Sequence, residues 1–295
     1  MKFFLIKFSY YLILIFIFLG ILDFYIFPRN NNVMTFKNSL LKRESKQVVI
    51  LGNSHTFFGL KPSLLKKKAI NIANKARKLE TDYFILRKNL SKLKDTQVII
   101  LPISYYSLFT RKITKEEKRL YYHFYGIEKY NQNFFDNSLL LNNSFSELIK
   151  NIFIKYNKVS PLGWRANKEN YKFNLEIIKE KVGDIDEKIS RKQIIQSNII
   201  YLKRINELCI KKNIKLILLL PPYHPDFYKY SENVYNNKIK QILANLNLES
   251  SILIDSKKLN IVEDIYFENV DHLNENGAIV FTKKIDSIIN NVIDE

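Results

Sequence analysis

The chain has 295 residues, which suits one domain of about 200–250 residues with an appendage and allows a sizeable core. Hydrophobic residues make up 46% of the chain, and this fraction excludes a long disordered protein. The net charge is +18, but the lysines are scattered and no nucleic-acid recognition motif accompanies them. We therefore expect no nucleic-acid partner.

Cysteine and histidine are too sparse and too widely spaced to indicate a metal site. Cys209 is the single cysteine, so no intrachain disulfide is possible, and its helical surroundings predict a buried core position. The four histidines lack the spacing of metal ligands. We expect neither a metal nor a cofactor.

The amino-terminal segment has the length and composition of a membrane span. Phe3 to Leu22 is apolar or aromatic apart from three residues, and a helix of this length spans about 30 Å, the thickness of the hydrocarbon core. Lys2 and Lys7 favour a cytoplasmic amino terminus. The run ends in Asp-Phe-Tyr-Ile-Phe-Pro, a poor cleavage site. We predict an uncleaved anchor over residues 1–27 with the remaining chain outside the cytoplasmic membrane; a signal peptide or a buried helix is the rival interpretation.

The remaining chain alternates apolar runs with amphipathic segments. We interpret residues 28–45 as a linker and residues 46–295 as one domain that carries a helical, aromatic insertion at about 111–190. Alternating strands and helices imply crossovers and a parallel sheet. The expected fold is therefore a three-layer α/β/α arrangement with a mostly parallel central sheet. The expected strands are 48–51, 69–73, 97–104, 214–220 and 252–255, and the expected helices are 79–93, 193–211, 230–246 and 276–293.

Two short motifs carry the candidate chemistry. The first strand stops abruptly at Gly52-Asn53-Ser54, which places a serine hydroxyl at the carboxyl end of a buried strand. Open α/β sheets keep their ligand crevice at that edge. Near the other end of the chain stands Asp271-His272-Leu273-Asn274. A serine and a histidine at strand ends, far apart in sequence, are typical of a nucleophile and its base.

With these motifs in place, the chain resembles the SGNH (GDSL-like) hydrolase superfamily from about residue 46 to its end, outside the insertion. The resemblance implies that Ser54 is the nucleophile and that its own N–H is one donor of the oxyanion hole. By the same resemblance, Asn74 after the second strand is a second donor. Ser104 stands where the family usually has an oxyanion-hole Asn. We expect the residues that line the substrate site to be Asn53, His55, His224 and Tyr105.

The last family motif departs from its usual form. The family has Asp-x-x-His, whereas this chain has Asn269-Val270-Asp271-His272. The residue that orients the histidine must accept the imidazole N–H and stabilise the imidazolium. The orienting residue is then Asp271 or Asn269, and three alternatives stay open: Asp271 takes this role by a changed backbone path, His272 acts with Ser54 as a dyad, or the activity is weak.

Within the superfamily, the anchor and the two motifs look closest to extracytoplasmic acyl-transfer proteins, such as those of alginate O-acetylation and lipoteichoic-acid D-alanylation. The resemblance implies a serine esterase or O-acyltransferase that acts on an acylated glycan or envelope polymer, beside a multipass membrane acyltransferase. A non-catalytic scaffold of the same fold is the alternative. The aromatic insertion either stacks on sugar rings or forms the core of a small subdomain. Its members are Tyr121, Tyr122, Phe124, Tyr125, Phe134, Phe135 and Trp164.

Overall fold

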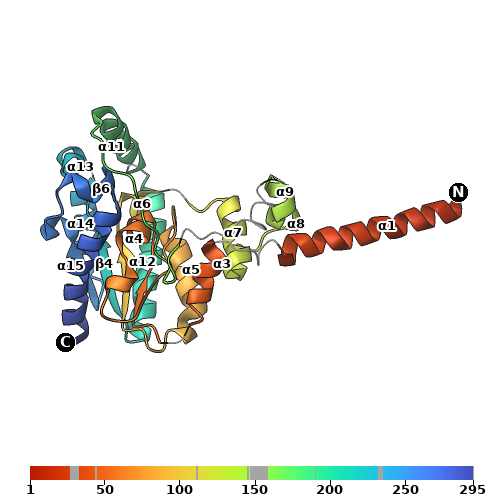
Figure 1. Cartoon of the computed structure of the whole chain (residues 1–295), viewed down its shortest axis with the longest axis horizontal. Coiled ribbons are helices and arrows are strands. Elements are labelled where there is room, and N and C mark those ends of the chain that lie inside the picture. The colour runs from red at the N-terminus through yellow and green to blue at the C-terminus, as the bar shows by residue number, and fades with distance from the viewer. Residues whose placement is uncertain are drawn as a thin grey trace. The chain divides into compact units, whose positions relative to one another are not determined.

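The structure is a computed structural model that describes residues 1–26, 33–43, 45–110, 112–144, 146, 159–189, 191–231 and 235–294 (Figure 1). By its internal contacts the chain divides into two compact units. The first, here unit 1, comprises residues 1–38 and 114–157, and the second, unit 2, comprises residues 39–113 and 158–295. Residue 27 of the predicted anchor and residues 28–32 and 44 of the predicted linker lie outside the described residues.

Unit 2 contains a five-stranded sheet in which every pair of neighbouring strands is parallel. The three central strands are buried almost throughout because both of their faces are covered, which explains their continuous apolar sequences. The predicted α/β class, with its parallel sheet, is confirmed. In spatial order the strands are β2 (Ala69–Asn71), β1 (Val48–Ile50), β3 (Val98–Pro102), β4 (Lys215–Leu220) and β5 (Ser251–Asp255).

Helices cover both faces of this sheet (Figure 1). One face packs against the long terminal helix α15 (Glu275–Asp294), whose Phe281, Ile285 and Ile289 join the buried side chains of β1, β3 and β4 in one core cluster. On the other face α12 (Lys192–Lys211) contacts both β4 and α5 (Leu79–Asn89). Cys209 on α12 is buried, as the sequence predicts.

The polypeptide after β4 differs from the sequence-based prediction. The predicted helix over 230–246 is described in two parts, the end of α13 (Pro225–Ser231) and α14 (Asn237–Leu246), and residues 232–234 between them lie outside the described residues. A separate antiparallel hairpin, β6 (Phe267–Asn269) and β7 (His272–Leu273), then precedes α15. The two strands read Phe-Glu-Asn and His-Leu, which are neither an apolar run nor long enough to show alternation, so the hairpin was not predictable.

Gly52 forms the turn after β1 and has no room for a side chain. Its φ is +101°, and an added Cβ would lie 2.2 Å from the Pro102 ring at the end of β3. Its N–H donates to Asp82 Oδ1 on α5 at 3.2 Å. The approach of β1 to β3 at this turn therefore requires glycine.

We expect Gly52→Ala to lower the free energy of unfolding by about 2–4 kcal/mol, because strained backbone and overpacking add. Urea unfolding of the full chain in detergent micelles measures this loss. Gly183→Ala is the matched control: an added Cβ there meets nothing within 4 Å, and α11 (Leu175–Ile189) gains a better helix former. Equal stability of Gly52→Ala and the parent chain would contradict the packing described for this turn.

Candidate active site

Ser54 opens a short helix at the carboxyl end of β1. Helix α4 (Ser54–Gly59) begins here because Asn53 caps it, its side-chain oxygen accepting the His55 N–H at 3.1 Å. Ser54 is the one partly exposed residue between Leu51 and Leu60, all others being buried. The hydroxyl is therefore the group of this segment that solvent or a substrate can reach.

The β6–β7 hairpin brings His272 to this serine. His272 Nε2 lies 2.7 Å from Ser54 Oγ, although the residues are 218 positions apart in sequence. Asp271 Oδ1 lies 3.0 Å from the other ring nitrogen, Nδ1, and Asn269 Oδ1 lies 3.2 Å from the same atom. Asn269 faces His272 across the hairpin. Side-chain oxygens of Asn269 and of Asp271 therefore both reach the imidazole ring. The ring therefore has a carboxylate partner despite the missing Asp at position 269.

Asp271 is fully buried and is held by two further side chains. Lys181 Nζ lies 2.6 Å from its Oδ1, and the Tyr105 hydroxyl donates to its Oδ2 at 2.5 Å. Burial alone would raise the pKa of this carboxyl, but His272 and the Lys181 ammonium hold it well below its usual range. Burial and Asp271 raise the pKa of Tyr105 well above its ordinary value, so its hydroxyl stays a donor. Asp271 is thus an ionised carboxylate fixed on three sides.

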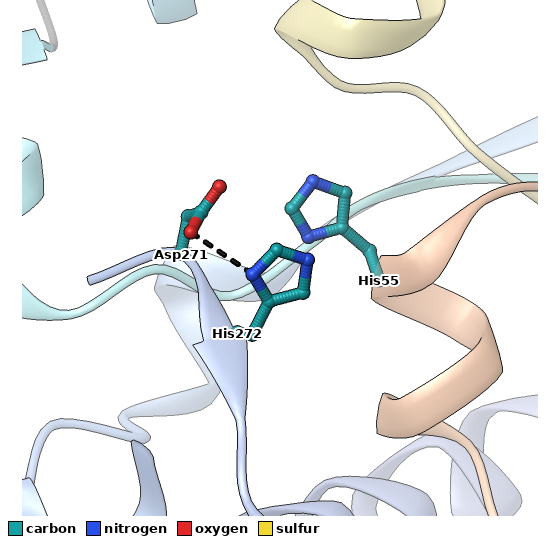
Figure 2. A group of neighbouring side chains, drawn as sticks. All are labelled: His55, Asp271 and His272. Carbon is teal, nitrogen blue, oxygen red and sulfur yellow. Dashed lines mark hydrogen bonds and ion pairs between the residues drawn. The ribbon is translucent and has the colours of Figure 1, made fainter. Parts of the chain in front are cut away.

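His55 packs flat on the His272 ring. The ring centroids lie 4.8 Å apart with an interplanar angle of 13°, and Figure 2 shows Asp271 and His55 on either side of His272. Burial lowers the pKa of His55 to about 3, and His272 acts in the same direction. His55 is therefore a neutral wall of the site at neutral pH, and it does not compete with His272 for a proton.

These three residues also form a group of possible metal ligands among the described side chains, with ligand atoms within 4.8 Å of one another. Their hydrogen bonds fit a different use. Asp271 already faces the Lys181 ammonium, and the two His272 nitrogens face Asp271 and Ser54. A cation bound here would have to displace the lysine, so the arrangement suits proton transfer better than metal binding.

Two predicted oxyanion donors keep a free N–H in this structure. The Ser54 backbone N–H and the Asn74 side-chain amide have no hydrogen-bond partner among the residues that the structure describes. The Asn74 turn lies beside the nucleophile turn, because the Asn74 N–H donates to the Gly52 carbonyl at 3.0 Å. Both groups have the hydrogen-bonding capacity that an oxyanion hole requires.

Ser104 and Asn53 have structural roles that the sequence did not reveal. Ser104 is fully buried and caps α6 (Tyr105–Phe109), and its hydroxyl lies 3.3 Å from both Asn53 Nδ2 and Ser107 Oγ. Its N–H also points to Ser107 Oγ, at 3.2 Å. The expectation that Ser104 is an oxyanion donor is therefore corrected: its polar groups are used within the caps of α4 and α6. Asn53, expected to line the substrate site, is buried in the same network.

The expected role of His224 is also corrected. His224 is buried, its Nε2 lies 2.8 Å from Asp264, and its Nδ1 accepts the Asp226 N–H at 3.2 Å. Its backbone N–H donates to the Val270 carbonyl at 2.9 Å, so it braces the hairpin and offers no free nitrogen to a substrate. Tyr105 is partly exposed and donates to Asp271, so it lies at the site, and its expected contact with a substrate stays a prediction. Lys181 was missed altogether, because a lysine on an amphipathic helix carries no motif.

We expect Tyr105→Phe to lower the free energy of unfolding by about 1–3 kcal/mol, because one buried oxygen of Asp271 loses its donor. The neighbouring Tyr106→Phe is the control. Its hydroxyl donates to the Ala76 carbonyl at an exposed position, and its loss should cost well under about 1 kcal/mol. Thermal unfolding of both variants compares the two costs, and equal costs would contradict a structural bond between Tyr105 and Asp271.

Comparisons with known proteins add a remote likeness in structure. No family model and no curated protein matches the sequence. The solved structures that resemble this one include a protein from Streptococcus pneumonia provisionally called a platelet activating factor, with a TM-score of 0.43, covering 87% of this chain and 91% of that one.

Two other solved structures come from Bacteroides. A provisionally named acylhydrolase from Bacteroides fragilis has a TM-score of 0.41 and covers 87% and 93% of the two chains. A GDSL-like lipase from Bacteroides thetaiotaomicron has a TM-score of 0.39 and covers 89% and 98%. Each of the three proteins is 12% identical to this chain. One fold hosts many activities, so these likenesses define no reaction for this chain, and function has to be argued from its own site.

Proposed function

We propose that the chain is a membrane-anchored, extracytoplasmic serine esterase or O-acyltransferase that acts on acyl esters of cell-envelope glycans or polymers. The observation that carries this proposal is the 2.7 Å contact between Ser54 Oγ and His272 Nε2, with Asp271 on the opposite nitrogen. A serine, a histidine and an ionised carboxylate in this order form a nucleophile, its base and the group that orients the base.

The proposed reaction proceeds in two steps, acylation of Ser54 and transfer of the acyl group to an acceptor. Asp271 keeps the proton of the neutral ring on Nδ1, so Nε2 is free to take the Ser54 proton as Oγ attacks the ester carbonyl. The Ser54 N–H and the Asn74 amide stabilise the oxyanion. His272 then gives its proton to the departing alcohol, which leaves an acyl group on Ser54. In the second step His272 takes a proton from a glycan hydroxyl or from water, this oxygen attacks the acyl carbonyl, and His272 returns the proton to Ser54 Oγ as its bond to the acyl group breaks.

The amino-terminal helix supports the proposed location. Among the described residues, one helical segment, Lys2–Ile26, is long and apolar enough to cross a membrane, and both an anchor and a signal sequence meet this description. Lys2 and Lys7 at its start favour a cytoplasmic amino terminus and an extracytoplasmic catalytic unit. The resemblance to acyl-transfer proteins supplies the expected partners, an acylated envelope polymer and a multipass membrane acyltransferase.

The main support for the alternative of an inactive scaffold is that Asn269 stands where the family has its orienting Asp. The contact of the Asp271 carboxylate with His272 at 3.0 Å removes its main support, because the ring has a charged partner from the adjacent position. We therefore favour the catalytic hypothesis.

The purified full chain in detergent should hydrolyse a chromogenic short-chain acyl ester. Adding an unacylated envelope oligosaccharide should divert part of the acyl group to sugar hydroxyls, which mass spectrometry detects. Alcohol release without acylated sugar would restrict the function to hydrolysis. The absence of ester turnover with every acyl length tried would contradict both forms of the proposal.

A further inference from the structure

Unit 1 joins the end of the apolar helix to a small helical segment through a buried carboxylate. Helix α1 (Lys2–Ile21) continues into a π-helical turn, η1 (Leu22–Ile26), that contains Asp23. Asp23 is buried, and its Oδ1 accepts the N–H groups of Leu139 and Leu140 at 2.6 and 2.9 Å. A buried carboxylate needs such donors, so this pair of hydrogen bonds fixes α9 (Leu139–Asn142) to the end of the apolar helix.

Aromatic packing holds the neighbouring helices at the same level. The ring centroid of Phe24 in η1 lies 5.7 Å from that of Phe134 on α8 (Phe134–Asn137). It lies 5.6 Å from the ring centroid of His123 on α7 (Lys115–Tyr125). His123 Nε2 lies 2.7 Å from the Asn137 carbonyl oxygen, which ties α7 to α8. The segment 115–142 is therefore attached to the last turn of the apolar helix by hydrogen bonds and by ring contacts.

This attached segment exposes large apolar side chains. Phe134, Phe135 and Leu141 are 59%, 73% and 63% exposed, and we call these three residues the interfacial surface. Exposed apolar groups of this size, gathered on two short consecutive helices, are typical of an interaction site. Of the five other aromatic residues of the segment, Tyr122 is half-buried, and the remaining four form the core because they are buried: Tyr121, Phe124, Tyr125 and Tyr130.

The length of α1 sets the depth of this surface. Twenty residues at about 1.5 Å per residue span about 30 Å, so a helix that crosses the hydrocarbon over Lys2–Ile21 places η1 at the headgroup level. Groups bonded to Asp23 and packed on Phe24 lie at nearly the same level. Aromatic and aliphatic side chains at this boundary insert favourably between lipid headgroups.

We propose that the interfacial surface of unit 1 lies in the headgroup–acyl boundary of the bilayer, with Phe134, Phe135 and Leu141 inserted among the lipids. This inference rests on the membrane anchor of the proposed function. It adds that the chain holds the bilayer at two places, by its span and by a folded platform beside the end of the span.

A groove in unit 1 has the polarity that this location requires. It has a volume of about 630 Å³, and one wall is formed by Ile17, Gly20 and Ile21 of α1. His123 and Glu128 also line it. The groove thus combines apolar side chains of the span with polar side chains of the attached segment, and a lipid likewise has both an apolar and a polar part.

Charge does not drive this association. Segment 115–142 contains four basic residues (Lys115, Lys118, Arg119 and Lys129) and four acidic ones (Glu116, Glu117, Glu128 and Asp136). Insertion should therefore depend on apolar contact, and vesicles of zwitterionic phosphatidylcholine should suffice at any ordinary salt concentration.

The test places an environment-sensitive fluorophore on the surface of the full chain in phosphatidylcholine vesicles. Phe135→Cys and Leu141→Cys carry the probe, with Leu14→Cys in the middle of the span as a deep reference. Ile265 in unit 2 is 57% exposed, so Ile265→Cys supplies a matched apolar position outside unit 1. The natural Cys209 is buried and burial raises its thiol pKa to about 12, so a maleimide probe labels the introduced thiol.

We expect the probes at 135 and 141 to emit at shorter wavelength than the probe at 265 and to be quenched by lipids with a shallow spin label. The probe at 14 should be quenched most by a deep label. Flotation of the same samples with vesicles at alkaline pH reports the anchor separately. A chain that does not float overturns the anchor. A chain that floats while the probes at 135 and 141 match the probe at 265, without quenching, overturns the interfacial surface alone.

Discussion

Ser54→Ala should lower the kcat/KM of ester hydrolysis about 10⁴-fold or more, because no other hydroxyl can take the place of a nucleophile bonded to the base. The serine opens α4 at the carboxyl end of β1, and its Oγ lies 2.7 Å from His272 Nε2. Alanine keeps the helix start and leaves the Asn53 cap in place. The loss should therefore appear in turnover, with little change in the free energy of unfolding.

A second serine of the same unit supplies the matched control. Ser63 is exposed in the short helix η2 (Pro62–Leu64), and Ser63→Ala should keep the kcat/KM of the parent chain. Steady-state kinetics on one chromogenic ester compare the three proteins, and thermal unfolding confirms that each is folded. Ser54→Ala with a kcat/KM close to that of the parent chain would exclude the proposed mechanism.

Asp271→Asn should lower kcat/KM about 10³–10⁴-fold, whereas Asn269→Ala should lower it only about tenfold. The carboxylate of Asp271 fixes the proton of His272 on Nδ1 and stabilises the imidazolium, and an amide at the same place does neither. Asn269 contributes a neutral carbonyl oxygen to the same nitrogen and accepts the Asp271 N–H at 3.1 Å. The two variants together assign the orienting role that the sequence leaves open.

The half-buried Lys181 requires one further variant. Asp271→Asn leaves the Lys181 ammonium without its carboxylate, and an unpaired charge near the site would lower stability as well as activity. Adding Lys181→Met removes this charge, so the double variant should regain stability and stay inactive. A larger loss of kcat/KM for Asn269→Ala than for Asp271→Asn would show instead that Asn269 is the orienting residue.

The parallel sheet could be predicted because its central strands are buried on both faces. Such strands have to be continuous apolar runs, as Val98–Leu101 and Lys215–Leu220 are apart from the exposed Lys215. Each of these runs is followed directly by a proline, Pro102 or Pro221, at the carboxyl end of the strand. The hairpin that carries His272 lacks this signal because its short strands, Phe-Glu-Asn and His-Leu, mix apolar and polar residues.

The reactive pair could be predicted as well, but most of its surroundings could not. Ser54 and His272 follow from motifs at strand ends, and the structure brings them into contact. Lys181 reaches Asp271 from a helix 90 positions away, and only the folded chain shows this proximity. The roles of Ser104 and His224 depend on which buried polar atoms need partners, and a single sequence does not contain that information.

The most direct measurement is covalent labelling of Ser54 in the full chain by a fluorophosphonate, followed by peptide mass spectrometry. We predict one phosphonate on the peptide that contains Ser54, no adduct on Ser54→Ala, and labelling at least about 10³-fold slower in His272→Ala. A chain that hydrolyses esters while Ser54 stays unlabelled, or whose Ser54 reacts equally fast without His272, would contradict a nucleophile activated by that histidine.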